Sequence, residues 1–163
     1  MLGIIKFEVN LLIKRYIRKM IKRDSIRRIG YYEYFGNKNT LRKYEIENCG
    51  ATFMDGSIYI LWDSDFYNSL SIQERTFCRL HELGHFTGCK NITELFTHER
   101  RLDEEVRADS YAVKRMGYMD GIVAMKQLLN HIEEYQKMEM NQRINIQKMM
   151  FDMTKYVDQY SAL

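Results

Sequence analysis

Apolar residues recur at helical spacing along most of this chain. Residues 72–86 hold no Pro and only one Gly, Gly84, and Phe77, His81, Gly84 and His85 recur at helical spacing. Ser71 and Glu74 form the S-x-x-E pattern of a capping box, which predicts where this helix begins. Glycine costs roughly 1 kcal/mol against alanine in a helix interior, so we expect a second helix to pack closely at Gly84.

Three further helices are predicted after this one. Residues 102–116 follow helical spacing and are succeeded by Gly117, a residue suited to the left-handed turn past a helix. Asp120 can cap a helix that runs through about residue 136, and another helix is expected from about residue 141 to 160. We expect the methionines between 138 and 153 to pack in the helical core.

A different pattern precedes the first helix. Two β-prone runs between Ala51 and Trp62 flank Asp55-Gly56, a dipeptide typical of tight hairpin turns. A strand beside a catalytic cleft can bind an extended substrate as an added strand. The candidate for such a strand at the rim of a cleft, here called the rim strand, comprises Ser57, Ile58, Tyr59 and Ile60. The alternative is that the hairpin only covers the helices. The elements together predict an α+β fold, mostly helical with a small sheet or hairpin before the first helix.

The first 28 residues differ in charge from the rest. Nine Lys or Arg against two acidic residues give +7 there, which leaves about −4 for the remainder of a chain whose formal net charge is +3. Apolar residues at helical spacing predict a basic amphipathic helix over residues 1–30, followed by one domain over residues 31–163. This helix could pack against the domain, lie on an anionic membrane surface or contact nucleic-acid phosphates.

The remaining composition indicates a cytoplasmic protein, with peripheral contact to a membrane left open. No apolar run approaches the roughly 20 residues that span a bilayer, so no transmembrane segment is expected. Three widely spaced cysteines, Cys49, Cys78 and Cys89, suit a reducing compartment.

The sequence HELGH over residues 81–85 carries the candidate chemistry. Positions i and i+4 of a helix share a face, so His81 and His85 can bind one tetrahedral zinc ion while Glu82 lies beside them as a proton acceptor. On the helix predicted over residues 102–116, Glu105 can supply a third ligand. Asp109, one turn later, can accept a hydrogen bond from the far nitrogen of a ligating histidine.

Two assignments have alternatives at this stage. Glu104 and His98 also carry donor atoms that could complete the ligand set. The group that stabilises an oxyanion stays unassigned, because spacing alone does not rank the donors of Arg107, Tyr111, His98 and Tyr118.

The motif pair resembles that of the gluzincin peptidases, in which an HExxH helix is completed by a glutamate from a later ExxA[DE] segment. HELGHFTGCK, residues 81–90, is similar to a stretch of plasmid and phage antirestriction proteins, and EVRADSYAVKRMG, residues 105–117, looks like the ExxADxxA helix of the CAAX prenyl endopeptidase and HtpX group. ImmA/IrrE-type regulators share the general plan. The resemblance covers roughly residues 51–129. Cys89 replaces the histidine of the antirestriction pattern, and the transmembrane helices of the HtpX group are missing.

This resemblance implies a zincin-like fold of the minigluzincin kind and a zinc-dependent endopeptidase that hydrolyses a protein or peptide substrate. His81, His85 and Glu105 would be the Zn²⁺ ligands and Glu82 the general base that activates water. The alternative function is a catalytically silent zincin-fold binding protein or an antirestriction-type inhibitor.

Overall fold

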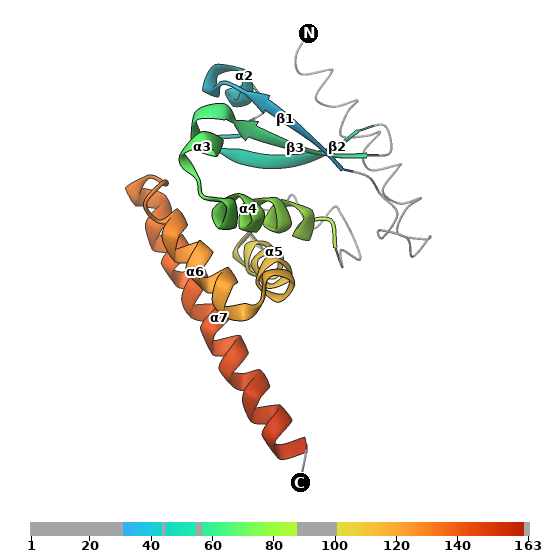
Figure 1. Cartoon of the computed structure of the whole chain (residues 1–163), viewed down its shortest axis with the longest axis vertical. Coiled ribbons are helices and arrows are strands. Elements are labelled where there is room, and N and C mark those ends of the chain that lie inside the picture. The colour runs from blue at the N-terminus through green and yellow to red at the C-terminus, as the bar shows by residue number, and fades with distance from the viewer. Residues whose placement is uncertain (1–30, 44, 55–56, 88–100, 162–163) are drawn as a thin grey trace.

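The computed structural model of the chain describes residues 31–43, 45–54, 57–87 and 101–161. Helices make up most of these residues and a three-stranded sheet lies before them, so the predicted α+β class is confirmed. In Figure 1 the sheet forms one layer, α4 runs beneath it, and α5, α6 and α7 lie on the far side of α4. The elements are β1 (Tyr31–Gly36), α2 (Lys38–Arg42), β2 (Cys49–Met54), β3 (Ser57–Asp63), α3 (Ser64–Ser69), α4 (Ile72–Gly84), α5 (Arg101–Met116), α6 (Tyr118–Leu128) and α7 (Glu134–Ser161).

The sheet has the order β1-β3-β2, with β3 parallel to β1 and antiparallel to β2. Met54 pairs with Ser57, which confirms the predicted hairpin between β2 and β3. Strand β1 was not predicted, because its aromatic residues do not alternate with polar ones and most are exposed. Its Glu33 carboxylate accepts hydrogen bonds from Trp62 Nε1 at 3.0 Å and from Arg79 Nε at 2.8 Å, so β1 is tied to both β3 and α4.

The position of β3 contradicts the rim-strand hypothesis for Ser57, Ile58, Tyr59 and Ile60. Residues 58–60 pair with β1 on one side and with β2 on the other, and Ser57 pairs with β2. A substrate strand needs backbone groups that no other strand uses. The hairpin pattern predicted the strand β3, but no pattern in the sequence indicated that β1 pairs with its second side.

Helix α4 begins where the capping box predicts. Ser71 Oγ accepts from the Glu74 backbone N–H at 3.2 Å, and Glu74 Oε2 accepts from the Ser71 N–H at 2.7 Å. The helix ends at Gly84, with His85 as the C-terminal cap residue. Because His85 keeps helical backbone angles, φ −60° and ψ −25°, it stays on the same face as His81.

The expected close contact at Gly84 is present. A Cβ atom built on Gly84 would lie 2.8 Å from the carbonyl oxygen and 2.9 Å from the Cα of Ala108 in α5. Ala108 and Ala112 are fully buried, so small side chains line the contact from the α5 side as well. The two helices therefore approach each other closely, as the sequence predicts.

The later helices differ from their predicted boundaries. Gly117, with φ 91°, precedes α6, so Asp120 lies within the first turn of α6 and does not cap it. Helix α6 ends at Leu128 and α7 begins at Glu134, because the chain turns between them. His131 in this turn lies 3.2 Å from Ser69 Oγ and 3.1 Å from Glu74 Oε1, which holds the turn against the start of α4.

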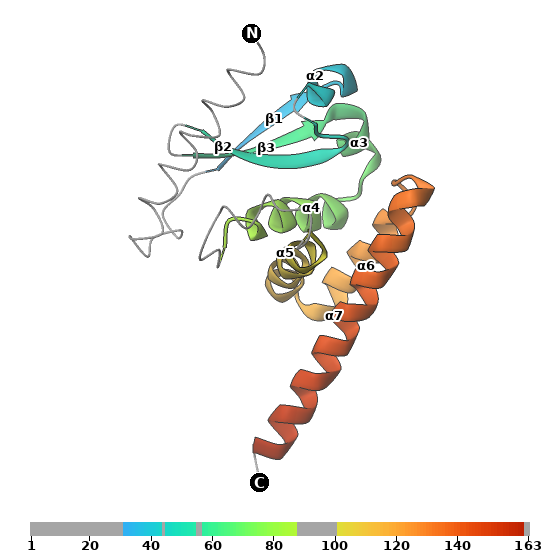
Figure 2. The ribbon, with the colours of Figure 1, turned by 180° about the vertical axis from the view of Figure 1, so that it is seen from behind.

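The methionines of α7 do not pack as predicted. Met140 packs against the core, whereas the side chains of four others are exposed: Met138, Met149, Met150 and Met153. The C-terminal half of α7 extends past the other described helices (Figures 1 and 2), which agrees with the exposure of Met149, Met150 and Met153.

Several predictions fall outside the described residues. They are the basic helix over residues 1–30 and the two side chains His98 and Cys89. Among the helices that the structure does describe, none has both the length and the apolar character needed to cross a bilayer.

Replacing Gly84 by alanine tests the contact between α4 and α5. The new methyl group would meet backbone atoms of α5, so Gly84→Ala should lower the free energy of unfolding by about 1–3 kcal/mol in urea denaturation. Gly121→Ala is the comparison variant for the contact between α5 and α6, because a Cβ atom built on Gly121 would lie 2.8 Å from the Val113 Cα. A gain of stability in Gly84→Ala, as helix propensity alone would give, would contradict the close approach.

Candidate metal centre

Three side chains from two helices converge at the end of α4. His81 Nε2 lies 3.2 Å from His85 Nε2 and 3.3 Å from Glu105 Oε2, and His85 Nε2 lies 3.8 Å from Glu105 Oε1. One donor atom from each lies within 4.8 Å of the others. Donors bound at about 2.0–2.1 Å in a tetrahedral zinc site lie about 3.3 Å apart. The spacing and the two-His, one-Glu donor set therefore fit a zinc ion with a further coordination position.

Asp109 orients the first of these ligands. Its Oδ1 lies 2.8 Å from His81 Nδ1, and the carboxylate is fully buried. A hydrogen bond at Nδ1 leaves Nε2 turned toward His85 and Glu105. Asp109 lies one helical turn after Glu105, so α5 supplies both a candidate ligand and the hydrogen-bond partner of another.

Arg143 of α7 completes the arrangement, and the sequence analysis missed it. Its Nε donates to Asp109 Oδ2 at 2.7 Å, its Nη2 to Asp109 Oδ1 at 2.6 Å, and its Nη1 lies 3.0 Å from Glu105 Oε2. The residue is almost fully buried, with 8% of its surface exposed. Its position between Met140 and Ile144 on the inward face of α7 was the one available signal, since a charge on such a face requires a partner.

Glu82 lies beside the candidate ligands and outside their cluster. Burial raises the pKa of its carboxyl group to about 7, with the nearby Glu105 charge adding to the rise, and the charge of His81 and a hydrogen bond from the Ala51 backbone N–H limit it. A carboxylate with a pKa near neutrality can both take and return a proton. Glu82 thus has the property that a general base requires.

The two histidines differ in protonation when no metal is bound. Burial lowers the pKa of His85 to about 4, so its imidazole is neutral and offers a lone pair. Burial also acts to lower the pKa of His81, but hydrogen bonds to Asp109 and Glu105 outweigh it and raise that pKa to about 10. A metal ion would therefore displace a proton from His81 Nε2, while Nδ1 keeps its proton and donates it in the hydrogen bond to Asp109.

The Glu105 carboxylate is ionised in this setting. Burial acts to raise its pKa, but the hydrogen bond with His81 and the charges of His81 and Arg143 hold it well below its usual range. An ionised carboxylate is the form that binds a metal ion.

Arg107, an oxyanion candidate, contacts the end of α4 and also Glu104, an alternative ligand. Arg107 donates to the carbonyl oxygens of Gly84 and His85 at 3.2 Å each and to that of Thr87, and its Nη2 lies 2.6 Å from Glu104 Oε2. The guanidinium group therefore caps the C-terminal end of α4, where a cation is favourable. Among the described residues Glu104 is not part of the ligand cluster, which contains Glu105.

Two further oxyanion candidates have ring contacts with residues outside the ligand cluster. The Arg115 guanidinium lies 4.9 Å from the centre of the Tyr111 ring, and Tyr118 stacks on Phe151 with ring centres 3.5 Å apart. The fourth candidate, His98, is outside the described residues. No described residue is therefore assigned to the stabilisation of an oxyanion.

The edge of the sheet nearest the centre is β2. The Asp63 N–H donates to the Asn48 carbonyl, so in the antiparallel alternation the backbone groups of Cys49, Ala51 and Phe53 point away from β3. The hydrogen bond from the Ala51 N–H to Glu82 agrees with this direction. Among the described strands, β2 and not β3 therefore has an edge, beside the predicted general base, with which no other described strand pairs.

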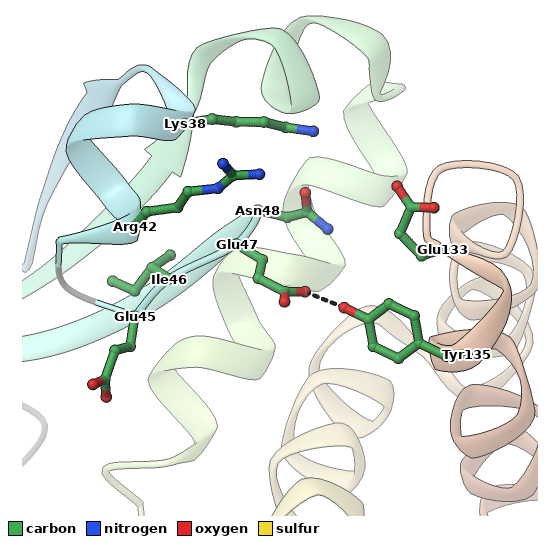
Figure 3. A pocket seen from close by; sticks show the side chains of 8 residues that line it. All are labelled: Lys38, Arg42, Glu45, Ile46, Glu47, Asn48, Glu133 and Tyr135. Carbon is green, nitrogen blue, oxygen red and sulfur yellow. Dashed lines mark hydrogen bonds between the residues drawn. The ribbon is translucent and has the colours of Figure 1, made fainter.

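A cavity of about 390 Å³ lies elsewhere, between the start of α7 and the segment before β2 (Figure 3). Tyr135 Oη donates to Glu47 at 2.7 Å across it, and Gln136 Nε2 donates to the same carboxylate at 2.8 Å. The cavity is lined by charges of both signs, from Lys38, Arg42, Glu45, Glu47 and Glu133. None of the predicted site residues lines it.

Comparison of the chain with protein-family models, with curated proteins and with solved structures finds no match.

Zinc binding should depend on the three clustered side chains. We expect one zinc ion per chain by elemental analysis, and removal of zinc by a chelator should lower the melting temperature, because the folded state alone holds the preformed site. His81→Ala, His85→Ala and Glu105→Gln should each lose stoichiometric zinc.

The matched controls are Glu104→Gln and His131→Gln, which change the same residue types outside the cluster. Both should retain one zinc ion. Loss of zinc in Glu104→Gln but not in Glu105→Gln would show that the ligand set is wrong.

Proposed function

We propose that this protein is a zinc-dependent endopeptidase of the gluzincin type, with a zincin-like fold, that hydrolyses peptide bonds in a protein or peptide. The observation that carries the proposal is the set formed by His81, His85 and Glu105 together with Glu82, a carboxylate beside the set and outside it. A purely structural zinc site usually has four protein ligands, whereas three ligands with an adjacent base are typical of zinc hydrolases.

Each side chain of the candidate site would have a separate role in peptide hydrolysis. Zinc, when bound, would act as a Lewis acid toward the substrate carbonyl and would acidify water. Glu82 accepts a proton from the attacking water and returns it to the nitrogen of the leaving amine. Asp109 keeps the His81 ring in place through the 2.8 Å contact at Nδ1.

The edge of β2 with which no described strand pairs is the proposed place for an extended substrate. The backbone groups of Cys49, Ala51 and Phe53 turn away from β3, and the Ala51 N–H contacts Glu82. A peptide that pairs with this edge would pass directly beside the general base. The proposed substrate-binding strand is therefore β2, and not residues 57–60 of β3.

Glu82→Gln separates catalysis from metal binding. We expect this variant to keep one zinc ion per chain, because Glu82 is outside the ligand set, and to lose hydrolysis by at least about 10²- to 10⁴-fold, the usual contribution of a general base. The measurement is mass-spectrometric detection of cleaved bonds in a proteome-derived peptide library.

Two results would contradict the endopeptidase proposal. One is cleavage by Glu82→Gln at the wild-type rate. The other is a zinc-loaded wild-type protein that cleaves no peptide, which would favour the catalytically silent binding or inhibitor protein.

A further inference from the structure

Arg143 connects the C-terminal helix to both acidic residues of the candidate centre. It makes two hydrogen bonds to Asp109, at 2.6 and 2.7 Å, and its third nitrogen lies 3.0 Å from Glu105 Oε2. The exposed fraction of its side chain is 10%, and that of the Asp109 side chain is zero. A buried guanidinium with three such contacts is held in one orientation.

The shape of arginine fits this position. Glu105 and Asp109 are four residues apart on α5, so their carboxylates lie on one face, one turn apart. A planar guanidinium has donors on three nitrogens and can bind one carboxylate through two of them while the third reaches the other. A lysine ammonium is a single point of charge and cannot reproduce this fork.

We infer that Arg143 is a positioning residue of the metal centre: it holds Glu105 Oε2, which would leave Oε1, 3.8 Å from His85 Nε2, as the one oxygen that binds the metal. The inference rests on the proposed zinc site. Arg143 also fixes Asp109, and through it His81, whose Nδ1 lies 2.8 Å from the same Asp109 oxygen that accepts from Nη2. A single side chain from α7 thereby controls the orientation of two candidate ligands.

Two effects of Arg143 on metal affinity oppose each other. Its positive charge repels a cation, so its removal would strengthen metal binding by simple electrostatics. Its removal also leaves Asp109 and one Glu105 oxygen without their buried partner, so both carboxylates would turn. We expect the second effect to prevail, because all three guanidinium nitrogens are used in positioning contacts.

The inference is tested with full-length Arg143→Lys and Arg143→Met. Zinc affinity is measured by competition with a chromophoric chelator, and coordination is measured from the visible absorption spectrum of the Co²⁺-substituted protein. We expect zinc dissociation constants that are about 10- to 100-fold higher than wild type, the usual effect of losing an outer partner of a ligand. We also expect a weaker Co²⁺ absorption band, because a Glu105 that binds through both oxygens raises the coordination number above four.

Gln147→Met is the matched control. Gln147 is also buried on α7 and donates to the Val106 carbonyl at 2.8 Å and to Ser110 Oγ at 3.0 Å, but it contacts neither Glu105 nor Asp109 in any described hydrogen bond. This variant should lose stability and keep the wild-type zinc affinity and Co²⁺ spectrum. The same spectral change in Gln147→Met would reduce the role of Arg143 to general contact between α5 and α7, and would overturn the inference.

Arg143→Lys decides the outcome if Arg143→Met does not fold. It keeps the charge and loses the fork, so wild-type affinity and spectrum in Arg143→Lys would also overturn the inference. A wild-type protein that binds no zinc would refute the inference together with the zinc site. A wild-type protein that binds zinc and cleaves nothing would refute the endopeptidase function alone, and the comparison of Arg143 variants would still decide the inference.

Discussion

The short distance between α4 and α5 is the constraint on which the candidate centre depends. The backbone of Ala108 lies where a side chain on Gly84 would be, so the two helices meet with almost nothing between them. At this separation a glutamate of α5 reaches the imidazoles of α4, and an aspartate one turn later reaches the far side of His81. A wider gap would place Glu105 beyond contact with either histidine.

Buried charge is the second constraint. Glu105 and Asp109 carry two negative charges in a region with little water, and such groups are retained only with partners. The Arg143 guanidinium is one partner. The His81 imidazole, protonated because its pKa is raised, is the other in the metal-free protein. A divalent ion bound to His81 Nε2 would supply the positive charge that the His81 proton supplies without the metal.

The sequence predicted the parts of this fold that follow from local rules. The capping box of Ser71 and Glu74, the small residues at the helix contact and the β2–β3 hairpin all have short-range patterns, and each is present. Strand β1 and Arg143 have no such pattern. The pairing of β1 with β3 and the contact of Arg143 with α5 join segments that are distant in sequence, so only the tertiary structure reveals them.

The place of Arg143 in the chain has a consequence for biosynthesis. His81, His85 and Glu105 leave the ribosome before the residues of α7 do, and a domain generally folds as a unit once its parts are available. Until α7 reaches α5, the two α5 carboxylates lack the guanidinium that orients them. The candidate centre is therefore completed only after α7 has been synthesised, and a nascent chain that stops short of residue 143 would lack the Arg143 contacts.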